Sequence, residues 1–262
     1  MPEYLLQIDG LTKSFEGLRA VDGYRLHLQA GEILGIIGPN GAGKSTVFNL
    51  LTGHLRASSG AIRFRGLDIT RLPPERIARL GIGRTFQNIR LFPGMTVLEN
   101  VVCASQLHRR SALAATLLSW PSFRRTESEL VASAREQLGL FGLEERASAP
   151  ASSLPYGDQR RLEIVRALAL RPTLLLLDEP TAGMNTQESL RVLELIRRIR
   201  EQYRLTIVLV EHNMPLVMRL CERLQVLNYG QIIAEGSPDK VRVDPRVVES
   251  YLGTENAEAA GS

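Results

Sequence analysis

The sequence predicts an α/β fold organised around a phosphate-binding loop. An apolar run at Ile33–Ile37, typical of a buried strand, leads into a glycine-rich segment, and the helical pattern Val47–Leu51 follows. The segment fits G-x-x-x-x-G-K-[ST], and strand, loop and helix in this order are the context in which that motif holds phosphate. The loop residues are Gly38, Pro39, Asn40, Gly41, Ala42, Gly43, Lys44, Ser45 and Thr46.

The parts of this loop have distinct roles in binding a nucleoside triphosphate. Glycines let the backbone approach phosphate closely, and the amide groups and the helix dipole attract its negative charge. Lys44 is expected to reach the β- and γ-phosphates, and the Ser45 hydroxyl to hold Mg²⁺. The alternative, a glycine-rich turn beside a chance Lys-Ser pair, leaves the flanking strand and helix unexplained.

Composition indicates a globular protein without deciding its partner. The chain has 262 residues, 44% of them hydrophobic, and a formal net charge of +4. The positive balance permits attraction to an anionic membrane surface or to nucleic acid. No apolar run reaches membrane-spanning length, and residues 1–10 lack a signal-peptide plan. Cys103 and Cys221 show no metal-like spacing and are expected to be small buried residues in a reducing cytosol.

The chain contains strand-like segments and a mainly helical segment. Strand-like pieces at Leu5–Leu11, Tyr24–Leu28 and Ala61–Phe64 predict an N-terminal antiparallel β layer beside the nucleotide core. Capping boxes at Thr96–Glu99 and Thr126–Glu129 predict helices in the middle of the chain, the second ending near Gly139. We expect a single domain, with its core at 1–87 and 160–253, an inserted helical subdomain at about 88–159 and a disordered tail at 254–262.

The helical insertion is rich in arginine, including Arg109, Arg110, Arg124 and Arg125. These side chains form either a solvated face or a docking surface for acidic lipid headgroups or a partner protein. Composition does not separate the two interpretations.

Acidic residues follow a second buried strand. The apolar run Thr173–Leu177 ends in Asp178 and Glu179, at the strand end where enzymes with this loop place their second magnesium anchor. Asp178 is expected to hold Mg²⁺ and Glu179 to act as general base on the attacking water. The alternative for Glu179 is a carboxylate salt-bridged at a strand end. His212, after the strand Leu205–Val210, could hydrogen-bond the γ-phosphate, although a lone histidine is usually structural.

Phe15 lies upstream of the loop and has two interpretations. On sequence grounds a buried core aromatic is the more common outcome. A flat ring is also a surface on which adenine stacks.

The order of these elements resembles an ATP-binding-cassette (ABC) ATPase. The phosphate loop is followed by Gln87, a helical insertion, the segment Leu154–Leu162, the run Leu-Leu-Asp-Glu-Pro and a histidine, and this order covers nearly the whole chain. Within the family, the stretches Arg84–Gln87 and Glu211–Met214 resemble the ATPase subunit of branched-chain amino acid importers.

The resemblance implies ATP and Mg²⁺ as cofactors and gives roles to several residues. Phe15 matches the adenine-stacking aromatic, Gln87 the glutamine that senses magnesium and contacts the membrane subunits, and His212 the switch histidine. Leu154, Pro155, Tyr156, Gly157 and Asp158 match the signature loop, which completes the site of the opposite subunit in an ATP-sandwiched dimer. The implied partners are a second ATPase subunit, two transmembrane permeases and, indirectly, a substrate-binding protein, with no nucleic acid, at the cytoplasmic face of the inner membrane.

The signature departs from the general family pattern. Pro155 stands where most members carry a serine, and it offers neither hydroxyl nor N–H. Tyr156 replaces a glycine, and Asn185 stands where many members have aspartate. These changes predict that the composite site using this signature is the weaker of two, in a dimer with a different ATPase subunit. A homodimer is the alternative.

Three other functions are compatible with parts of the sequence. An ABC ATPase for urea or amide uptake, or for lipopolysaccharide export, would keep the enzymology and change the partners. A soluble ABC ATPase acting on DNA or ribosomes usually carries two cassettes or long coiled coils, and this chain has neither. A non-hydrolysing nucleotide-binding module is disfavoured by the presence of Lys44, Asp178, Glu179 and His212 together.

Overall fold

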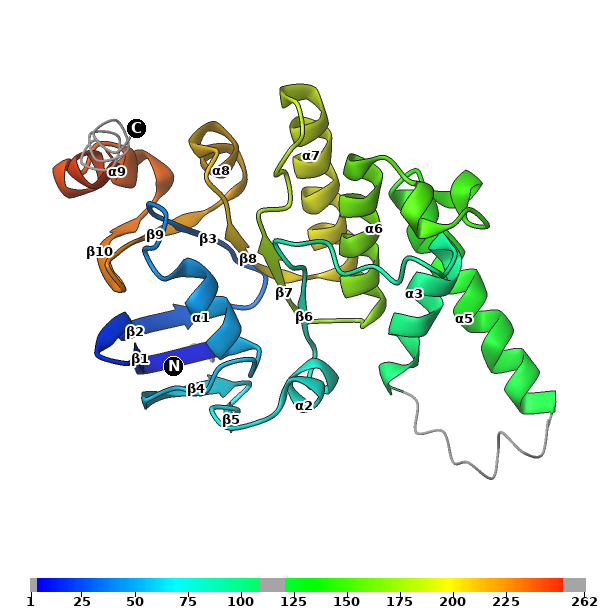
Figure 1. Cartoon of the computed structure of the whole chain (residues 1–262), viewed down its shortest axis with the longest axis horizontal. Helices are drawn as coiled ribbons and strands as arrows, with labels where there is room; N and C mark the ends of the chain where they lie inside the picture. The colour runs from blue at the N-terminus through cyan, green and yellow to red at the C-terminus, as the bar shows by residue number, and fades with distance from the viewer. Residues whose placement is uncertain (1–3, 109–120, 252–262) are drawn as a thin grey trace.

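A six-stranded sheet forms the centre of the computed structural model, which describes residues 4–108 and 121–251 (Figure 1). The strand order is β10-β9-β3-β8-β7-β6, and every neighbouring pair is parallel except β10 with β9. The strands are β3 (Ile33–Ile37), β6 (Ile82–Arg84), β7 (Leu174–Asp178), β8 (Thr206–Val210), β9 (Arg223–Asn228) and β10 (Gln231–Gly236).

Side chains of the central strands enter two hydrophobic clusters, one on each face of the sheet. Along β3, Ile33 and Ile37 join one cluster while Leu34 and Ile36 join the other. This alternation follows from the two-residue period of a strand. All residues of β3, β7 and β8 are buried, as expected for parallel strands covered on both sides.

Helices cover the sheet between successive strands. Helix α1 is the next element after β3, and α7 begins at a capping box in which the Asn185 side chain accepts from the Glu188 amide. The helices are α1 (Lys44–Leu51), α2 (Pro74–Arg79), α6 (Tyr156–Ala169), α7 (Thr186–Tyr203), α8 (Met214–Leu220) and α9 (Pro238–Arg242), and residues 245–251 are also helical.

The predicted N-terminal β layer is confirmed as an antiparallel four-stranded sheet of order β2-β1-β4-β5. It lies beside α1 in Figure 1, and its apolar face shares a core with that helix. The strands are β1 (Leu6–Phe15), β2 (Leu18–Leu28), β4 (Ser59–Phe64) and β5 (Leu67–Asp68).

The middle of the chain is helical and lies at the opposite end of the molecule from β10 (Figure 1). Its elements are α3 (Val97–Ser105), α5 (Pro121–Leu140) and 3₁₀ turns at Gln106–His108, Glu144–Arg146 and Ala151–Ser153. The capping box at Thr96 and Glu99 is confirmed. The predicted helix start at Thr126 is wrong, because Thr126 lies inside α5, which is already helical at Pro121.

Several sequence predictions concern residues outside the described ranges. Arg109, Arg110 and the tail 254–262 are among them. Within the described ranges, no helix combines the length and the apolar character needed to cross a membrane.

One prediction about the cysteines is wrong. Cys221 is buried as expected, but Cys103 is exposed. The reason is helical periodicity: α3 buries Val97, Asn100 and Val101, and Cys103 therefore lies off that inward face.

Candidate nucleotide-binding site

The predicted phosphate loop connects β3 to α1 and has a backbone that requires glycine. Gly43 has φ 105° and Gly38 has φ 147°. A Cβ atom at Gly43 would lie 2.4 Å from the carbonyl oxygen of Ala20, and one at Gly38 would lie 2.1 Å from that of Leu227. The loop is thus pressed against β2 and β9 too closely for any side chain at these two positions.

Lys44 places a buried cation inside this loop. Its Nζ donates to the carbonyl oxygens of Gly38 and Pro39, both at 2.8 Å. Burial lowers the pKa of Lys44, and the nearby Glu179 and Asp178 carboxylates oppose that effect. The first turn of α1 contains no acidic residue, so the positive end of its dipole stays available to an anion.

The two acidic residues after β7 occupy different environments. Asp178 is only 2% exposed, and its Oδ2 accepts a hydrogen bond from Arg84 at 3.0 Å. Burial raises the pKa of Asp178, opposed by the adjacent Arg84 guanidinium. Its Oδ1 is buried without a hydrogen-bond partner among the described residues. Such a buried carboxylate oxygen fits a divalent cation or its water shell, because oxygen atoms are the ligands that magnesium takes.

Glu179 meets Gln87 and His212 in a three-residue cluster. His212 Nε2 lies 2.6 Å from Glu179 Oε1, and Gln87 Nε2 lies 3.3 Å from each Glu179 oxygen. Glu179 itself has φ 48°, an uncommon value for a residue with a side chain. The three residues were predicted from separate segments of the sequence, and the structure brings them together.

This cluster and the phosphate loop line one cavity of about 280 Å³. The Glu179 carboxylate faces the loop across the cavity. A carboxylate beside a histidine can accept a proton from water. The lining residues are Ala20, Asn40, Gly41, Ala42, Gly43, Lys44, Ser45, Thr46, Gln87, Glu179 and His212.

Phe15 lies outside this cavity, at the end of β1. The structure does not support the buried-core interpretation, since Phe15 is 42% exposed. Lys13 Nζ lies 4.7 Å from the centre of its ring. The exposed ring leaves a face that a planar base can cover.

The residues matching the signature loop lie at the start of α6, also outside the cavity. Pro155 occupies the N-cap position without a side-chain capping bond, and Tyr156 is 47% exposed. Leu154 is buried in the core, and Asp158 pairs with Arg161. The chain therefore does not bring residues 154–158 to its own phosphate loop.

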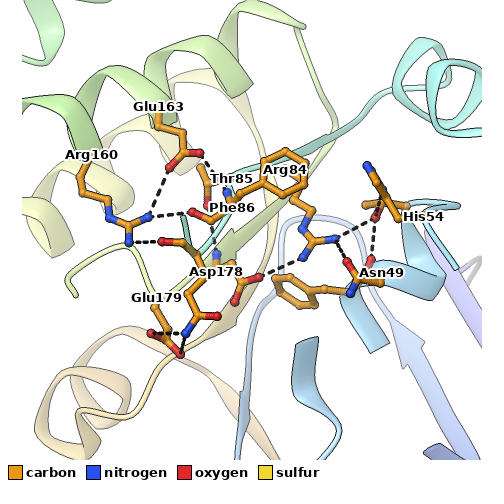
Figure 2. Close-up of polar contacts among 12 residues, drawn as sticks. Asn49, His54, Arg84, Thr85, Phe86, Arg160, Glu163, Asp178 and Glu179 are labelled. Carbon is orange, nitrogen blue, oxygen red and sulfur yellow. Dashed lines mark hydrogen bonds and ion pairs between the residues drawn. The ribbon is translucent and has the colours of Figure 1, made fainter. Parts of the chain in front are cut away.

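A buried arginine that the sequence did not single out, Arg160, holds the segment around Gln87. Arg160 donates to the Phe86 carbonyl at 2.7 Å and also to that of Gln87 (Figure 2). Its neighbour Glu163 accepts from the Phe86 amide at 3.2 Å. The first turns of α6 thereby fix the backbone on both sides of Gln87. In the sequence, this role is indicated only by the spacing of Arg160 and Glu163, three residues apart on one face of α6.

A second buried carboxylate fixes the loop after β7. Glu211 accepts hydrogen bonds from the Thr181 amide at 3.0 Å and the Thr181 hydroxyl at 2.6 Å. It ties the end of β8 to the segment just beyond Glu179. Glu211 therefore supports the geometry of the cluster without being part of it.

Comparison with known proteins agrees with this site. Residues 21–182 match the ABC transporter family model, and residues 231–257 match the model of the branched-chain amino acid ATP-binding cassette transporter. The chain therefore belongs to the ABC transporter family, as one of its ATP-binding cassettes.

Two relatives are named as transport subunits. The chain is 46% identical to the high-affinity branched-chain amino acid transport ATP-binding protein LivG of Escherichia coli K12, covering 97% of this chain and 99% of that protein. It is 44% identical, with the same coverage, to BraF of Pseudomonas aeruginosa, which carries the same description.

Two solved cassettes share the fold. The ADP conformation of MJ1267, an ATP-binding cassette of an ABC transporter, has a TM-score of 0.83 at 33% identity, covering 95% of this chain and 99% of that one. A dimeric post-hydrolysis state of the cassette MJ0796, bound to ADP and Pi, has a TM-score of 0.76 at 26% identity, covering 89% and 98%.

Proposed function

We propose that this chain is the ATP-hydrolysing subunit of an ABC importer for branched-chain amino acids. The observation that carries the ATPase activity is the single cavity in which Glu179, His212 and Gln87 face the phosphate loop. The cargo rests on the relatives described as branched-chain amino acid transport proteins and on the match of residues 231–257.

ATP binding and hydrolysis divide among the residues that line the cavity and two residues outside its lining, Phe15 and Asp178. The loop amides and Lys44 hold the phosphates, and Phe15 offers its exposed ring to the adenine. Ser45, Gln87 and Asp178 would hold Mg²⁺, which neutralises phosphate charge when bound. Glu179 accepts the proton of the attacking water, and His212 orients the Glu179 carboxylate and hydrogen-bonds the γ-phosphate.

The working unit is a dimer in which each signature loop completes the partner's site. Residues 154–158 lie outside the cavity of their own chain, which is what an intersubunit role requires. Pro155 adds no hydroxyl or N–H to the partner's nucleotide. We therefore assign the partner as a second, different ATPase subunit.

The membrane permeases would dock beside Gln87. A groove of about 340 Å³ lies between the segment after Gln87 and helices α3 and α6. Its walls include Phe86, Phe92, Cys103 and Leu107, with the guanidinium of Arg166 over the Phe92 ring at 4.8 Å. Phe86 lines this groove and the next residue, Gln87, lines the nucleotide cavity, so movement in the groove would reach the cavity. We place the chain, as part of this proposal, at the cytoplasmic face of the inner membrane as a peripheral subunit.

Purification of the tagged chain from native membranes in mild detergent tests this function. Mass spectrometry should identify two multi-span permeases and a second ATPase subunit, and transport of leucine by the reconstituted complex should require ATP. A homodimer with export permeases would retain the ATPase and overturn the cargo. Recovery with nucleic acid or ribosomes from the soluble fraction would refute the transport function.

A further inference from the structure

The arginine that ends β6, Arg84, connects the two elements that carry the proposed magnesium ligands Ser45 and Asp178. Arg84 Nη2 donates to Asp178 Oδ2 at 3.0 Å, and its Nη1 donates to Asn49 Oδ1 at 2.7 Å. Asp178 ends β7, and Asn49 belongs to α1, the helix whose first turn holds Lys44 and Ser45. One guanidinium thus spans the distance between strand and helix, as Figure 2 shows.

Several contacts hold the Arg84 side chain in one place. Its Nη1 also donates to the Thr52 hydroxyl at 3.0 Å. The guanidinium lies 4.8 Å from the centre of the Phe86 ring and 5.5 Å from that of Phe48. The side chain is 7% exposed. A planar guanidinium with its donors in a fixed fork is suited to such a position, and a flexible ammonium is not.

This arrangement determines which oxygen of Asp178 stays available. Oδ2 is occupied by Arg84, and the Asp178 amide donates to the Thr85 hydroxyl at 3.0 Å. The backbone and one carboxylate oxygen are both fixed. Oδ1 is the atom left without a partner within the described part of the chain.

We infer that Arg84 is a positioning residue that prepares the magnesium site before nucleotide arrives. It fixes the Asp178 carboxylate with Oδ1 free and holds α1, and with it Ser45, at a set distance from β7. The inference rests on the proposed function, because it presumes that this loop binds ATP with Mg²⁺. Residues that orient a metal-binding side chain without touching the metal typically change metal affinity by about 10- to 100-fold.

Nucleotide binding measured against magnesium concentration tests this role. A fluorescent ATP analogue is titrated onto wild type and Arg84→Met, in EDTA and at increasing Mg²⁺. We expect Arg84→Met to raise the half-saturating Mg²⁺ concentration by about tenfold or more. Its affinity for the analogue in EDTA should stay unchanged, because Lys44 and the loop amides are intact.

Two further variants give the experiment its controls. Arg63→Met removes an arginine that also pairs with an aspartate, Asp9, at 3.6 Å, but on the exposed small sheet, and it should behave as wild type. Asn49→Ala keeps the Arg84–Asp178 pair and removes one of the two links from Arg84 to α1, leaving the bond to Thr52 at its C-terminal end, so it should give a smaller rise in the half-saturating Mg²⁺ concentration. If Arg84→Met does not fold, the half-saturating Mg²⁺ concentration of Asn49→Ala tests the role of Arg84 by itself.

Two sets of results would contradict the role of Arg84. A residue that only stabilises the fold would lower the melting temperature and weaken binding equally with and without Mg²⁺. That outcome, or an unchanged magnesium midpoint, would overturn the role of Arg84. Wild-type binding that ignores Mg²⁺ would overturn the proposed function itself, and the role of Arg84 with it.

Discussion

His212 Nε2 and Glu179 Oε1 lie 2.6 Å apart although 33 positions separate them in the chain. The cause is the register of two parallel strands, in which Asp178 at the end of β7 pairs with Val210 at the end of β8. The chain leaves the sheet at the same edge after both strands. This edge also receives the phosphate loop after β3, which places acid, imidazole and loop around one cavity.

Two glycines of the loop make a matched pair of variants. Gly43→Ala places a Cβ 2.4 Å from the Ala20 carbonyl oxygen, whereas a Cβ at Gly41 meets nothing within 4 Å although its φ is 79°. Gly41→Ala therefore introduces backbone strain alone, which costs about 1 kcal/mol. If this strain opposes ATP binding, the affinity falls about fivefold. Gly43→Ala adds a steric clash and should lose at least about a hundredfold. Isothermal titration with ATP compares them, and equal losses would refute the close packing of the loop on β2.

The start of α6 offers a test of the asymmetric dimer. Pro155→Ser supplies a hydroxyl and an N–H for the partner's nucleotide, so the ATPase rate of the assembled complex should rise about fivefold for roughly 1 kcal/mol of added hydrogen bonding. Pro155→Ala is the control, because it restores the N–H and omits the hydroxyl. An unchanged rate in Pro155→Ser would contradict the weaker composite site.

The two cysteines should differ in reactivity. Burial raises the pKa of Cys221 to about 12, while Cys103 is exposed on α3. Since the thiolate is the reactive species, a maleimide at pH 7 should label one thiol per native chain, and Cys103→Ser should abolish that labelling. Cys103 should be protected in the complete transporter, because it lines the proposed permease groove. Equal labelling with and without permeases would argue against docking there.

The sequence predicted what depends on local patterns and missed what depends on distant pairs. The phosphate loop, the buried strand β7 and the cap at Thr96 each follow from a few consecutive residues. The contact between Arg84 and Asp178 joins positions 94 residues apart, and no local pattern indicates which buried acid an arginine will meet. The exposure of Phe15 likewise depends on how the β1–β2 hairpin sits on the core.

The two capping boxes also show that a local pattern does not always predict the structure. Thr96 and Glu99 cap α3 through a reciprocal pair of bonds at 3.2 and 2.8 Å. Thr126 and Glu129 have the same spacing but lie inside α5. The spacing of a capping box is thus compatible with a helix interior.

Single-turnover ATP hydrolysis by Glu179→Gln tests the central claim most directly. The amide keeps the size of the side chain but cannot accept a proton from water. We predict that ATP and Mg²⁺ bind as in wild type while hydrolysis slows by at least about a hundredfold. Hydrolysis at the wild-type rate in this variant would contradict the claim that Glu179 in this cavity is the general base.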